Sequence, residues 1–326
     1  MAMRVIETLD FEPLPPSACA LGMFDGVHIG HQAVLSACLA QARERQLMPV
    51  VFSFQNHPQH ALSPTPLPLL SALPDRLAAF EAMGFDVALV PPFSPALMQM
   101  PASVYAEAML ARQINAKAVV TGYDYHFGLH RQGDVALLAA LGPRLGFAVT
   151  TMAPVKAHFA GGEQIISSTQ IRKLLQYGDV EAAAALLGRP YALPGTLVKG
   201  DGRGHKLGFA TANMAPAENR LVPAVGVYAC WLQIAEQTFP AACNIGFNPT
   251  VLQGDARPSS PRIETHALLS AGEAWPEQAV LGTPFQIKFV ARLRSEQRFE
   301  TLADLVRQIG QDCDLARVKL AQLNVI

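Results

Sequence analysis

Short apolar segments alternate with segments of helical periodicity through the first half of the chain. The predicted strands, which are short and mostly apolar, are residues 18–23, 49–54, 87–90, 118–122 and 147–151. The predicted helices, which repeat apolar side chains at helical spacing, are residues 31–46, 75–83, 103–113 and 135–141. Strands that alternate with helices favour a parallel sheet covered on both faces, with ligands bound at the carboxyl ends of its strands.

The pattern changes in the second half, where short strand-like segments are separated by Gly and Pro. These segments are residues 195–198, 226–234, 241–245, 263–269 and 285–293. They predict a small antiparallel barrel, and residues 302–323 predict a helix that closes the chain. The change lies near residues 185–194. We therefore predict an α/β protein with a parallel-sheet domain over residues 1–186 and an antiparallel β-barrel domain over residues 187–326.

Composition and charge narrow the possible partners. Half of the 326 residues are hydrophobic, which is enough apolar material for one or two packed cores. Lys and Arg number 25 against 26 Asp and Glu, for a net charge of −1. Because proteins that coat a polyanion are usually basic, we expect small-molecule partners and no general binding to nucleic acid. We also expect a monomer or a weak homo-oligomer.

The cysteines and the apolar segments indicate a cytoplasmic protein. The five cysteines form no C-x-x-C pair, so a disulfide scaffold or a structural zinc site is disfavoured. The first ten residues carry charges and no long apolar run, which argues against a signal peptide. The longest uncharged stretch, residues 46–74, contains six prolines, which a membrane helix would not tolerate. We therefore predict no membrane partner.

The first candidate site is the segment 22–31, GMFDGVHIGH, which follows a predicted strand and opens a predicted helix. Gly22 and Gly30 permit close approach of the backbone, and the helix N-terminus offers unpaired N–H groups to an anion. His28 and His31 are three residues apart, so both can face that anion and neutralise a phosphorane-like transition state. The alternative is an ordinary strand–turn–helix with two surface histidines.

A second segment, ISSTQIR at residues 166–172, supplies further phosphate-binding groups. Ser168 and Thr169 can cap the following helix, and their hydroxyl and N–H groups can also hold nucleotide phosphates. Arg172 lies one turn into the helix and can reach the same phosphates bidentately. Alone, this segment is usually only a capped helix. Its combination with H-x-G-H on an α/β chain predicts a nucleotide-transfer site.

These two segments resemble the nucleotidyltransferase superfamily, in which a nucleoside monophosphate passes from a triphosphate to an acceptor phosphate. Class I aminoacyl-tRNA synthetases share the H-I-G-H element but normally add a K-M-S-K-S loop, which we do not find. Together with FSFQNHP at residues 52–58 and GYDYHFG at residues 122–128, the motifs resemble the FAD synthetase half of bacterial bifunctional riboflavin kinase/FAD synthetases. The resemblance implies a Rossmann-like nucleotidyltransferase domain.

The resemblance also implies roles for individual residues. His28 and His31 would bind and neutralise the phosphates of ATP, within a nucleotide loop that includes Gly22, Phe24 and Gly30. The pyrophosphate side would be held by Ser168, Thr169 and Arg172. Asp124 would lie near the adenine nucleotide or the flavin, and His57 with Pro58 would help to form the pocket for the flavin phosphate. For His57, His60 and His126, the alternative is an ordinary loop histidine.

The second candidate site begins in the Gly-rich segment 195–213, which lacks the spacing of a Walker A loop. Thr211 and Asn213 alternate on one strand, and both carry oxygen atoms that Mg²⁺ accepts. Farther along, Glu264 lies on a strand and can accept a proton from a hydroxyl that attacks a γ-phosphate. The alternatives are a simple glycine-rich turn and a solvated strand carboxylate.

These segments resemble the riboflavin kinase domain, through GDGRGHKLGFATAN at residues 200–213, GVY at 226–228, NIGFNPT at 244–250 and IETH at 263–266. By this resemblance, Thr211 and Asn213 would bind Mg²⁺–ATP and Glu264 would be the general base. The Gly-rich loop, with Gly200 and Gly208, would contact the nucleotide, and Arg292 or Arg294 would line the ligand site. A solvated strand edge is the alternative for these two arginines.

The resemblance covers nearly the whole chain and implies a two-step flavin enzyme. The barrel would phosphorylate riboflavin to FMN with ATP, and the N-terminal domain would join FMN to AMP, giving FAD and pyrophosphate, with Mg²⁺ serving both steps. The family pattern is altered at His205, at Ala210 and in residues 270–275. These departures leave open a monofunctional FAD synthetase with an inactive barrel, a non-catalytic flavin-binding regulatory protein, and a relative that acts on an altered flavin or another phosphorylated alcohol.

Overall fold

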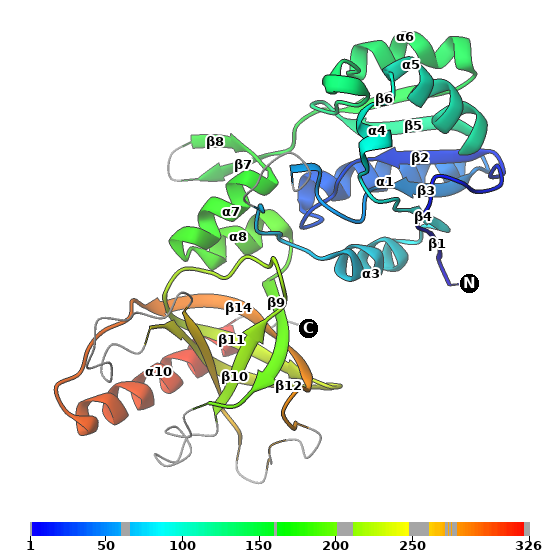
Figure 1. Ribbon diagram of the computed structural model, residues 1–326. Helices are drawn as coiled ribbons and strands as arrows, with labels where there is room; N and C mark the ends of the chain where they lie inside the picture. The colour runs from blue at the N-terminus through cyan, green and yellow to red at the C-terminus, as the bar shows by residue number, and fades with distance from the viewer. Residues whose placement is uncertain are drawn as a thin grey trace. The chain divides into compact units, whose positions relative to one another are not determined.

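The chain forms two compact units, residues 1–168 and residues 169–326. A computed structural model describes residues 2–59, 66–159, 162–200, 211–247, 261–270, 273, 275 and 279–322. Each unit has its own sheet system, an open parallel sheet in the first and a closed barrel in the second (Figure 1). In the described part of the chain, no helix combines the length and the apolar composition needed to cross a membrane.

The first unit is built on a parallel sheet, for which the described residues supply six strands in the order β1-β4-β3-β2-β5-β6. The strands are β1 (Arg4–Ile6), β2 (Ser17–Leu21), β3 (Met48–Phe52), β4 (Val87–Leu89), β5 (Ala116–Gly122) and β6 (Ala148–Met152). Neighbouring strands are parallel throughout. The central strand β2 is buried along its whole length, as expected of a strand with helices on both faces.

Helices cover both faces of this sheet and bury two separate apolar clusters. The helices are α1 (Ile29–Glu44), α3 (Leu73–Met83), α4 (Pro95–Met98), α5 (Ala102–Val104), the π-helix η1 (Tyr105–Gln113), the 3₁₀ turn η2 (Leu129–Arg131) and α6 (Val135–Leu145). Residues from α1 and α3 pack on one face, and residues from η1 and α6 pack on the other. The prediction of a parallel sheet covered on both faces is therefore confirmed.

The strand order places a ligand site at a defined position. The chain runs from β2 outward through β3 to β4, and then returns to add β5 on the other side of β2. The order of the strands thus reverses between β2 and β5, and open α/β sheets bind ligands outside the carboxyl ends of the strands at this point. The loop that begins at Gly22 follows β2, and the loop that ends at Gly128 follows β5.

The segment after β6 differs from the prediction, which placed no strand there. It forms a two-stranded antiparallel hairpin of β7 (Lys156–Phe159) and β8 (Gly162–Ile165). The described side chains of β8 are exposed, so the hairpin has none of the strong apolar patterning by which strands are recognised in a sequence. The short edge strand β1 was likewise not predicted.

The second unit is a closed antiparallel barrel, in the strand order β10-β13-β12-β11-β14-β9. Its strands are β9 (Tyr191–Val198), β10 (Thr211–Pro216), β11 (Gly226–Ile234), β12 (Gln237–Gly246), β13 (Arg262–Ala267) and β14 (Pro284–Arg294). Pairing of β9 with β10 closes the barrel. The predicted antiparallel barrel is therefore confirmed, and closure leaves no unpaired sheet edge.

Among the described residues, three helices accompany the barrel strands. Two of them, α7 (Ser168–Tyr177) and α8 (Val180–Leu187), precede β9, and α8 contacts β9 and β14. The last helix, α10 (Leu302–Gln322), lies alongside the barrel and contacts β11, β12 and β14 (Figure 1). It covers an outer patch that includes Ala229, Ala242 and Ala291. The predicted closing helix is confirmed, and small residues on the strands let it pack closely.

Candidate functional site

The loop between β2 and α1 has a strained and crowded backbone. Phe24 and Val27 have positive φ angles of 54° and 42°, which cost free energy for residues other than glycine. A Cβ added at Gly22 would lie 2.8 Å from the ring of Phe24. A Cβ added at Gly30 would lie 3.1 Å from the ring of His28. A side chain at position 22 would therefore displace the Phe24 ring, and one at position 30 would require the His28 ring to shift slightly.

The two predicted histidines lie together at the beginning of α1. Their rings stack with centroids 3.6 Å apart and planes inclined by 19°. His28 is the N-cap of α1, and its Nδ1 accepts a hydrogen bond from the backbone N–H of His31 at 3.2 Å. Because Nδ1 is an acceptor, the proton of the neutral His28 ring lies on Nε2. Both histidines therefore lie at the beginning of α1, and their contact with a nucleotide phosphate stays a prediction.

The His31 ring is held in its neutral form. Burial lowers the pKa of His31 well below its usual value, and the nearby His28 and the positive charge of Arg76 lower it further. Its Nδ1 is buried and has no hydrogen-bond partner among the described residues. The edge of the Phe24 ring packs against it, with centroids 5.4 Å apart. His31 can therefore act as a hydrogen-bonding group at neutral pH, and not as a fixed cation.

Asp25 connects this loop to the segment before α3. Its carboxylate is buried and accepts hydrogen bonds from the backbone N–H of Leu70 and from the backbone N–H and hydroxyl of Ser71. In return, the Ser71 hydroxyl accepts a bond from the N–H of Gly26 at 2.6 Å. The Ser168 hydroxyl donates to the backbone carbonyl of Asp25 at 2.9 Å. The histidine loop is thus held from two other parts of the first unit.

Arg76 makes a second connection to the same loop. Its guanidinium is fully buried on α3. Nη1 donates to the Met23 carbonyl at 3.0 Å and to the Ser53 hydroxyl at 2.8 Å. Nη2 donates to the carbonyls of Phe54 and Gln55 at 2.8 and 3.2 Å. Burial lowers the pKa of Arg76 to about 10, so the group keeps its charge at neutral pH.

The predicted flavin and nucleotide residues after β3 and β5 occupy loops at the carboxyl edge of the sheet. His57 and Pro58 are partly buried, and Nδ1 of His57 accepts a bond from the N–H of Gln59 at 3.2 Å. Asp124 is exposed, and its backbone carbonyl lies 2.8 Å from Nδ1 of His126. These residues therefore follow strands that neighbour β2, which is followed by the histidine loop.

Aromatic side chains pack between the loops that follow β3 and β5. Tyr105 stacks on Phe52 and also contacts Phe127. Its hydroxyl lies 3.0 Å from the hydroxyl of Tyr125. Burial raises the pKa of both tyrosines, so the pair stays protonated at neutral pH. Phe54, which is partly buried, packs against this cluster.

The predicted phosphate-binding segment spans the division between the two units. Ser168 belongs to the first unit, whereas Thr169 and Arg172 belong to the second. Helix α7 begins at Ser168, so the residue directly before the helix is Ser167 and Thr169 lies inside the first turn. Ser168 and Thr169, which were predicted to cap the helix, are therefore its first two residues. Arg172 is buried, and its contact with nucleotide phosphates stays a prediction.

The predicted kinase residues share one face of the barrel. In the pairing of β10 with β13, Asn213 lies opposite Glu264 and Thr211 lies opposite His266. All four are partly exposed, whereas the alternate residues of both strands are buried. A Cβ added at Gly200 would collide with the amide group of Asn213. The structure therefore brings both predicted metal ligands, the predicted base and one loop glycine together.

The row of paired residues continues across the barrel through the buried Val227. Successive strand pairings place one residue from each of five strands in a row: Asn213, Glu264, Asn244, Val227 and Arg294. Asn244 thus lies directly beside Glu264, within cross-strand contact distance. Nearby, the Glu296 carboxylate accepts a hydrogen bond from the N–H of Phe247 at 3.1 Å, and a Cβ at Gly246 would collide with it.

Arg292 has several protein partners. Nη2 donates to the Val225 carbonyl at 2.9 Å, and Nη1 donates to the carbonyl of Tyr177 at the end of α7 at 3.2 Å. Its backbone N–H lies 3.5 Å from the Glu181 carboxylate of α8. The side chain therefore ties β14 to the helices that precede the barrel. A flavin-binding role for Arg292 stays a prediction.

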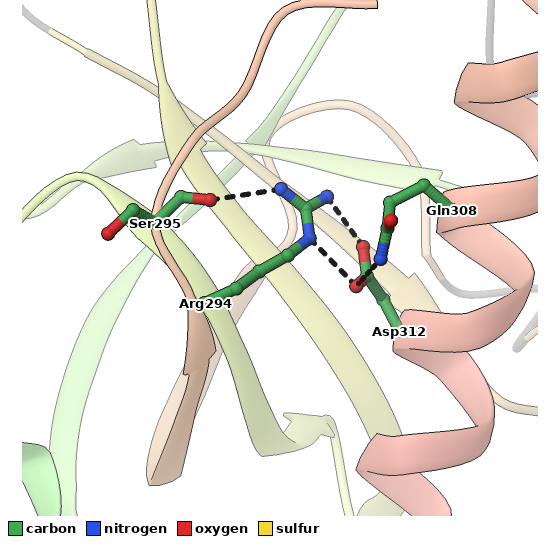
Figure 2. Close-up of polar contacts among 4 residues, drawn as sticks. All are labelled: Arg294, Ser295, Gln308 and Asp312. Carbon is green, nitrogen blue, oxygen red and sulfur yellow. Dashed lines mark hydrogen bonds and ion pairs between the residues drawn. The ribbon is translucent and has the colours of Figure 1, made fainter.

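Arg294 is bound to the closing helix (Figure 2). Its Nε and Nη2 donate to the two carboxylate oxygens of Asp312 at 2.8 and 2.7 Å. Nη1 donates to the backbone carbonyl of Ser295 at 3.0 Å. Gln308, one turn earlier on α10, donates to the same Asp312 carboxylate at 3.0 Å. A flavin-binding role for Arg294 likewise stays a prediction.

Part of the predicted kinase site lies outside the described residues. This holds for Gly208, for the altered positions His205 and Ala210, and for the end of the NIGFNPT segment. In the described part of the chain, no group of three or more His, Cys, Asp or Glu side chains could hold a metal ion. The candidate metal ligands Thr211 and Asn213 are instead a hydroxyl and an amide, whose oxygens suit a hard cation.

Sequence reasoning missed several residues that the structure places at these sites. Arg76 lies in an ordinary amphipathic helix, and only its contacts reveal that it reaches the histidine loop. Asp25 was visible inside the GMFDGVHIGH motif, but its partner Ser71 was not. Asn244 belonged to a recognised motif, and the register of β12 with β13 was needed to place it beside Glu264.

Comparison with known proteins accounts for both units. The family model described as FAD synthetase matches residues 11–170, and that described as riboflavin kinase matches residues 187–320. The bifunctional riboflavin kinase/FMN adenylyltransferase of Bacillus subtilis is 33% identical over 298 residues, covering 91% of this chain and 90% of the relative. The protein of the same name from Escherichia coli strain K12 is 32% identical and covers 95% of each chain.

A solved structure extends the similarity to the fold of the whole chain. A crystal structure described as a macrolide-efflux protein from Streptococcus pneumoniae has a TM-score of 0.81 and 27% identity, covering 97% of this chain and 99% of that chain. The similarity therefore includes the parallel sheet, the barrel and the order in which they follow one another. On the strength of the two domain matches and the full-length relatives, the chain belongs to the family of bifunctional riboflavin kinase/FMN adenylyltransferases.

Proposed function

We propose that the two activities of this family are divided between the parallel-sheet domain and the barrel of this chain. The barrel phosphorylates riboflavin with ATP and yields FMN, and the N-terminal domain joins FMN to AMP and yields FAD and pyrophosphate. The observation that carries the assignment is the pair of separate polar sites. One is the stacked His28 and His31 at the beginning of α1, and the other is Glu264 beside Asn213 on the barrel.

In the adenylyl transfer, a phosphate oxygen of FMN attacks the α-phosphorus of ATP, and the bond to the pyrophosphate breaks. Nε2–H of His28 donates to a phosphate oxygen, because Nδ1 is already occupied by the N–H of His31. His31, which is neutral, adds a second hydrogen-bonding group. Neither histidine forms a covalent bond, so the site works by positioning and by stabilising charge on the phosphate oxygens.

The remaining transferase residues bind the departing pyrophosphate, shape the nucleotide loop and line the adenine or flavin side. Ser168, Thr169 and Arg172 hold the departing pyrophosphate, and Gly22, Phe24 and Gly30 shape the nucleotide loop. The buried Phe24 ring supports a role in shaping this loop. Asp124, His57 and Pro58 line the adenine or flavin side. The placement of the last three after β5 and β3, at the carboxyl edge of the sheet, supports this assignment.

In the kinase reaction, Glu264 accepts the proton of the ribityl 5′-hydroxyl while that oxygen attacks the γ-phosphorus of ATP. The bond between the γ-phosphorus and the bridging oxygen breaks as the new phosphate ester forms, and ADP leaves with that oxygen. Gly200 lies against Asn213 and, with Gly208, carries the loop that covers the nucleotide. Asn244 lies beside Glu264 and helps to orient it.

The donor set fits a magnesium ion. The Thr211 hydroxyl and the Asn213 amide oxygen share a strand face, and Mg²⁺ is usually bound by a few protein oxygens together with water and substrate phosphates. When bound, the ion would neutralise charge on the ATP phosphates. Asn213 is one strand away from Glu264, so the residues that would hold the metal also hold the γ-phosphate near the base.

Arg292 and Arg294, at the carboxyl end of β14, shape the site that binds the ligand. Both guanidinium groups are already bonded to protein groups, so a direct contact with flavin would require these bonds to be exchanged. The match of both domain families favours the two-activity enzyme over a monofunctional FAD synthetase. The same match favours the two-activity enzyme over a non-catalytic flavin-binding protein.

The boundary between the two activities, the compartment and the partners are properties of the chain as a whole. We place the functional boundary between residues 186 and 187, where the riboflavin kinase match begins. The protein is cytoplasmic, acts on small molecules without nucleic acid or membrane, and is a monomer or a weak homo-oligomer. Five buried free cysteines support a reducing compartment.

The test is chromatography of the products formed by purified full-length protein with ATP and Mg²⁺, starting in parallel from riboflavin and from FMN. We expect FMN and FAD from riboflavin, and FAD from FMN. FAD from FMN but no FMN from riboflavin would mean that the barrel is inactive. Flavin binding without any product would support the regulatory protein instead.

A further inference from the structure

We propose that Arg76 is a positioning residue for adenylyl transfer, which holds the loop carrying His28 at a fixed separation from the segment that leads to His57. This inference rests on the assignment of adenylyl transfer to the N-terminal domain. It concerns a residue of α3 that lies outside every motif from which the activity was predicted.

The hydrogen bonds of Arg76 join two separate segments. The Met23 carbonyl belongs to the loop after β2, and the carbonyls of Phe54 and Gln55 belong to the segment after β3. Ser53 completes the connection, because its hydroxyl accepts from Nη1 of Arg76 and donates to the same Met23 carbonyl at 3.0 Å. One planar guanidinium therefore sets the distance between the two loops that carry the predicted phosphate and flavin residues.

This arrangement explains why an arginine is buried here. Burying a charge is costly unless its hydrogen bonds are satisfied, and both terminal nitrogens of Arg76 are fully used by the two loops, whereas its Nε has no partner among the described residues. The carboxylate of Asp25, on the same loop as His28, adds a favourable charge interaction. A lysine offers one point of attachment in place of a planar fork, so it would keep the charge without holding four acceptors in the same geometry.

The same charge acts on the His31 ring. Burial is the largest cause of the lowered pKa of His31, and His28 from the same loop and Arg76 from α3 lower it further. A fixed cation nearby disfavours the protonated ring, so Arg76 adds to the effect of burial in keeping His31 neutral as the pH falls. Arg76 thus has a second effect, on protonation, that a purely structural residue would not have.

Three variants separate the effects. Arg76→Lys keeps the charge and loses the fork, Arg76→Met loses both, and Ser53→Ala removes one acceptor of the fork. Arg144→Met, at an exposed position on α6, is the matched control. We would measure kcat and KM for ATP and FMN in FAD formation, together with FMN formation from riboflavin in the same preparation and the melting curve of each variant.

We expect Arg76→Lys to lower kcat for FAD formation by about 10²-fold with little change in KM, because a small misplacement of reacting groups costs about that factor. Arg76→Met should lower kcat at least as much. It should also raise the pKa of His31. In NMR, the midpoint of the titration of the His31 ring signals should then lie at a higher pH. Arg76→Lys should leave that titration unchanged. Riboflavin phosphorylation should stay at the level of the Arg144→Met control.

Several outcomes would overturn the proposal. One is that the folded Arg76 variants have kcat and KM values within twofold of the control and that Arg76→Met leaves the pKa of His31 unchanged. Another is a loss of FAD formation that merely follows the loss of folded protein. If Arg76→Met does not fold, Arg76→Lys and Ser53→Ala decide, and unchanged kcat in both would refute it. Absence of FAD formation in the unaltered protein would instead refute the assigned activity.

Discussion

Arg294 and Asp312 form a two-point ion pair between the last barrel strand and the closing helix, with both N···O distances below 3 Å (Figure 2). The pair is mostly shielded from water, with 19% and 8% of the two side chains exposed. Arg294 is in the same cross-strand row as Glu264 and Asn244. The pair therefore connects α10 to the end of the cross-strand row that contains the proposed base Glu264.

Removing the carboxylate of this pair should destabilise the barrel. Asp312→Ala leaves the Arg294 guanidinium largely buried without its partner, so we expect the free energy of unfolding to fall by about 2–4 kcal/mol. Asp314→Ala is the matched control, because Asp314 pairs with Arg317 at an exposed site on the same helix. Its expected cost is below about 1 kcal/mol. Urea unfolding followed by tryptophan fluorescence measures both, since Trp231 and Trp275 belong to the barrel unit; equal losses would contradict the prediction.

The two activities should respond separately to substitutions at the two sites. His28→Ala removes a donor to the phosphates, and we expect FAD formation from FMN to fall by about 10²–10³-fold. Glu264→Gln removes the base without changing its shape, and FMN formation from riboflavin should fall by about 10²–10⁴-fold. Each variant should retain the other activity. The exposed Glu163→Gln serves as control, and loss of both activities in either folded variant would refute the division.

The metal requirement should change only in the kinase. Thr211→Ala removes a proposed oxygen ligand, so the Mg²⁺ concentration for half-maximal FMN formation should rise by about 10-fold or more. The Mg²⁺ dependence of FAD formation should not change. Thr196→Ala, at an exposed position on β9, is the control. A Mg²⁺ titration that is the same for Thr211→Ala and the control would exclude Thr211 as a ligand.

Stability should fall in mild acid because of His31. Its pKa is well below its usual value in the folded protein, whereas the unfolded chain takes up a proton near pH 6.5. Below that pH the unfolded state binds more protons, so stability is lost as the pH falls, by up to about 1.4 kcal/mol per pH unit. His31→Asn should reduce this slope, and the exposed His158→Asn should not. Urea unfolding by circular dichroism between pH 5 and 7.5 measures the slope; an identical slope in both variants would contradict the assignment.

Much of the fold followed from the sequence because the periodicity of the buried elements was strong. The strand at residues 226–234 was predicted with its observed bounds, and the parallel sheet and the barrel were both correctly expected. The hairpin at residues 156–165 was missed, because exposed strands carry little apolar signal. The segment 103–113 was predicted as a helix, and most of it is wound as a π-helix, a distinction that apolar spacing over so few residues cannot make.

The candidate sites divide in a similar way. The spacing of three residues predicted that His28 and His31 lie at one helix start, which is a local property, whereas the stacking of their rings came from the structure. The pairing of Glu264 with Asn213 required the register of two strands that are separated by about fifty residues. The bonds that engage Arg292 and Arg294 arise from α7, α8 and α10, so the sequence could suggest that these arginines line a ligand without indicating that they already had partners.

By itself, the sequence indicated which chemistry we propose for the chain, because the candidate phosphate-binding histidines, metal-binding oxygens and carboxylate base occur in compact motifs whose spacing is local. Only the tertiary structure decided what supports those groups. Arg76 reaches Met23 across more than fifty residues, and Asp25 reaches Ser71 across a similar separation. Such contacts depend on where a packed helix places a side chain relative to distant loops. No local pattern records that position, since it is set by the packing of the whole domain.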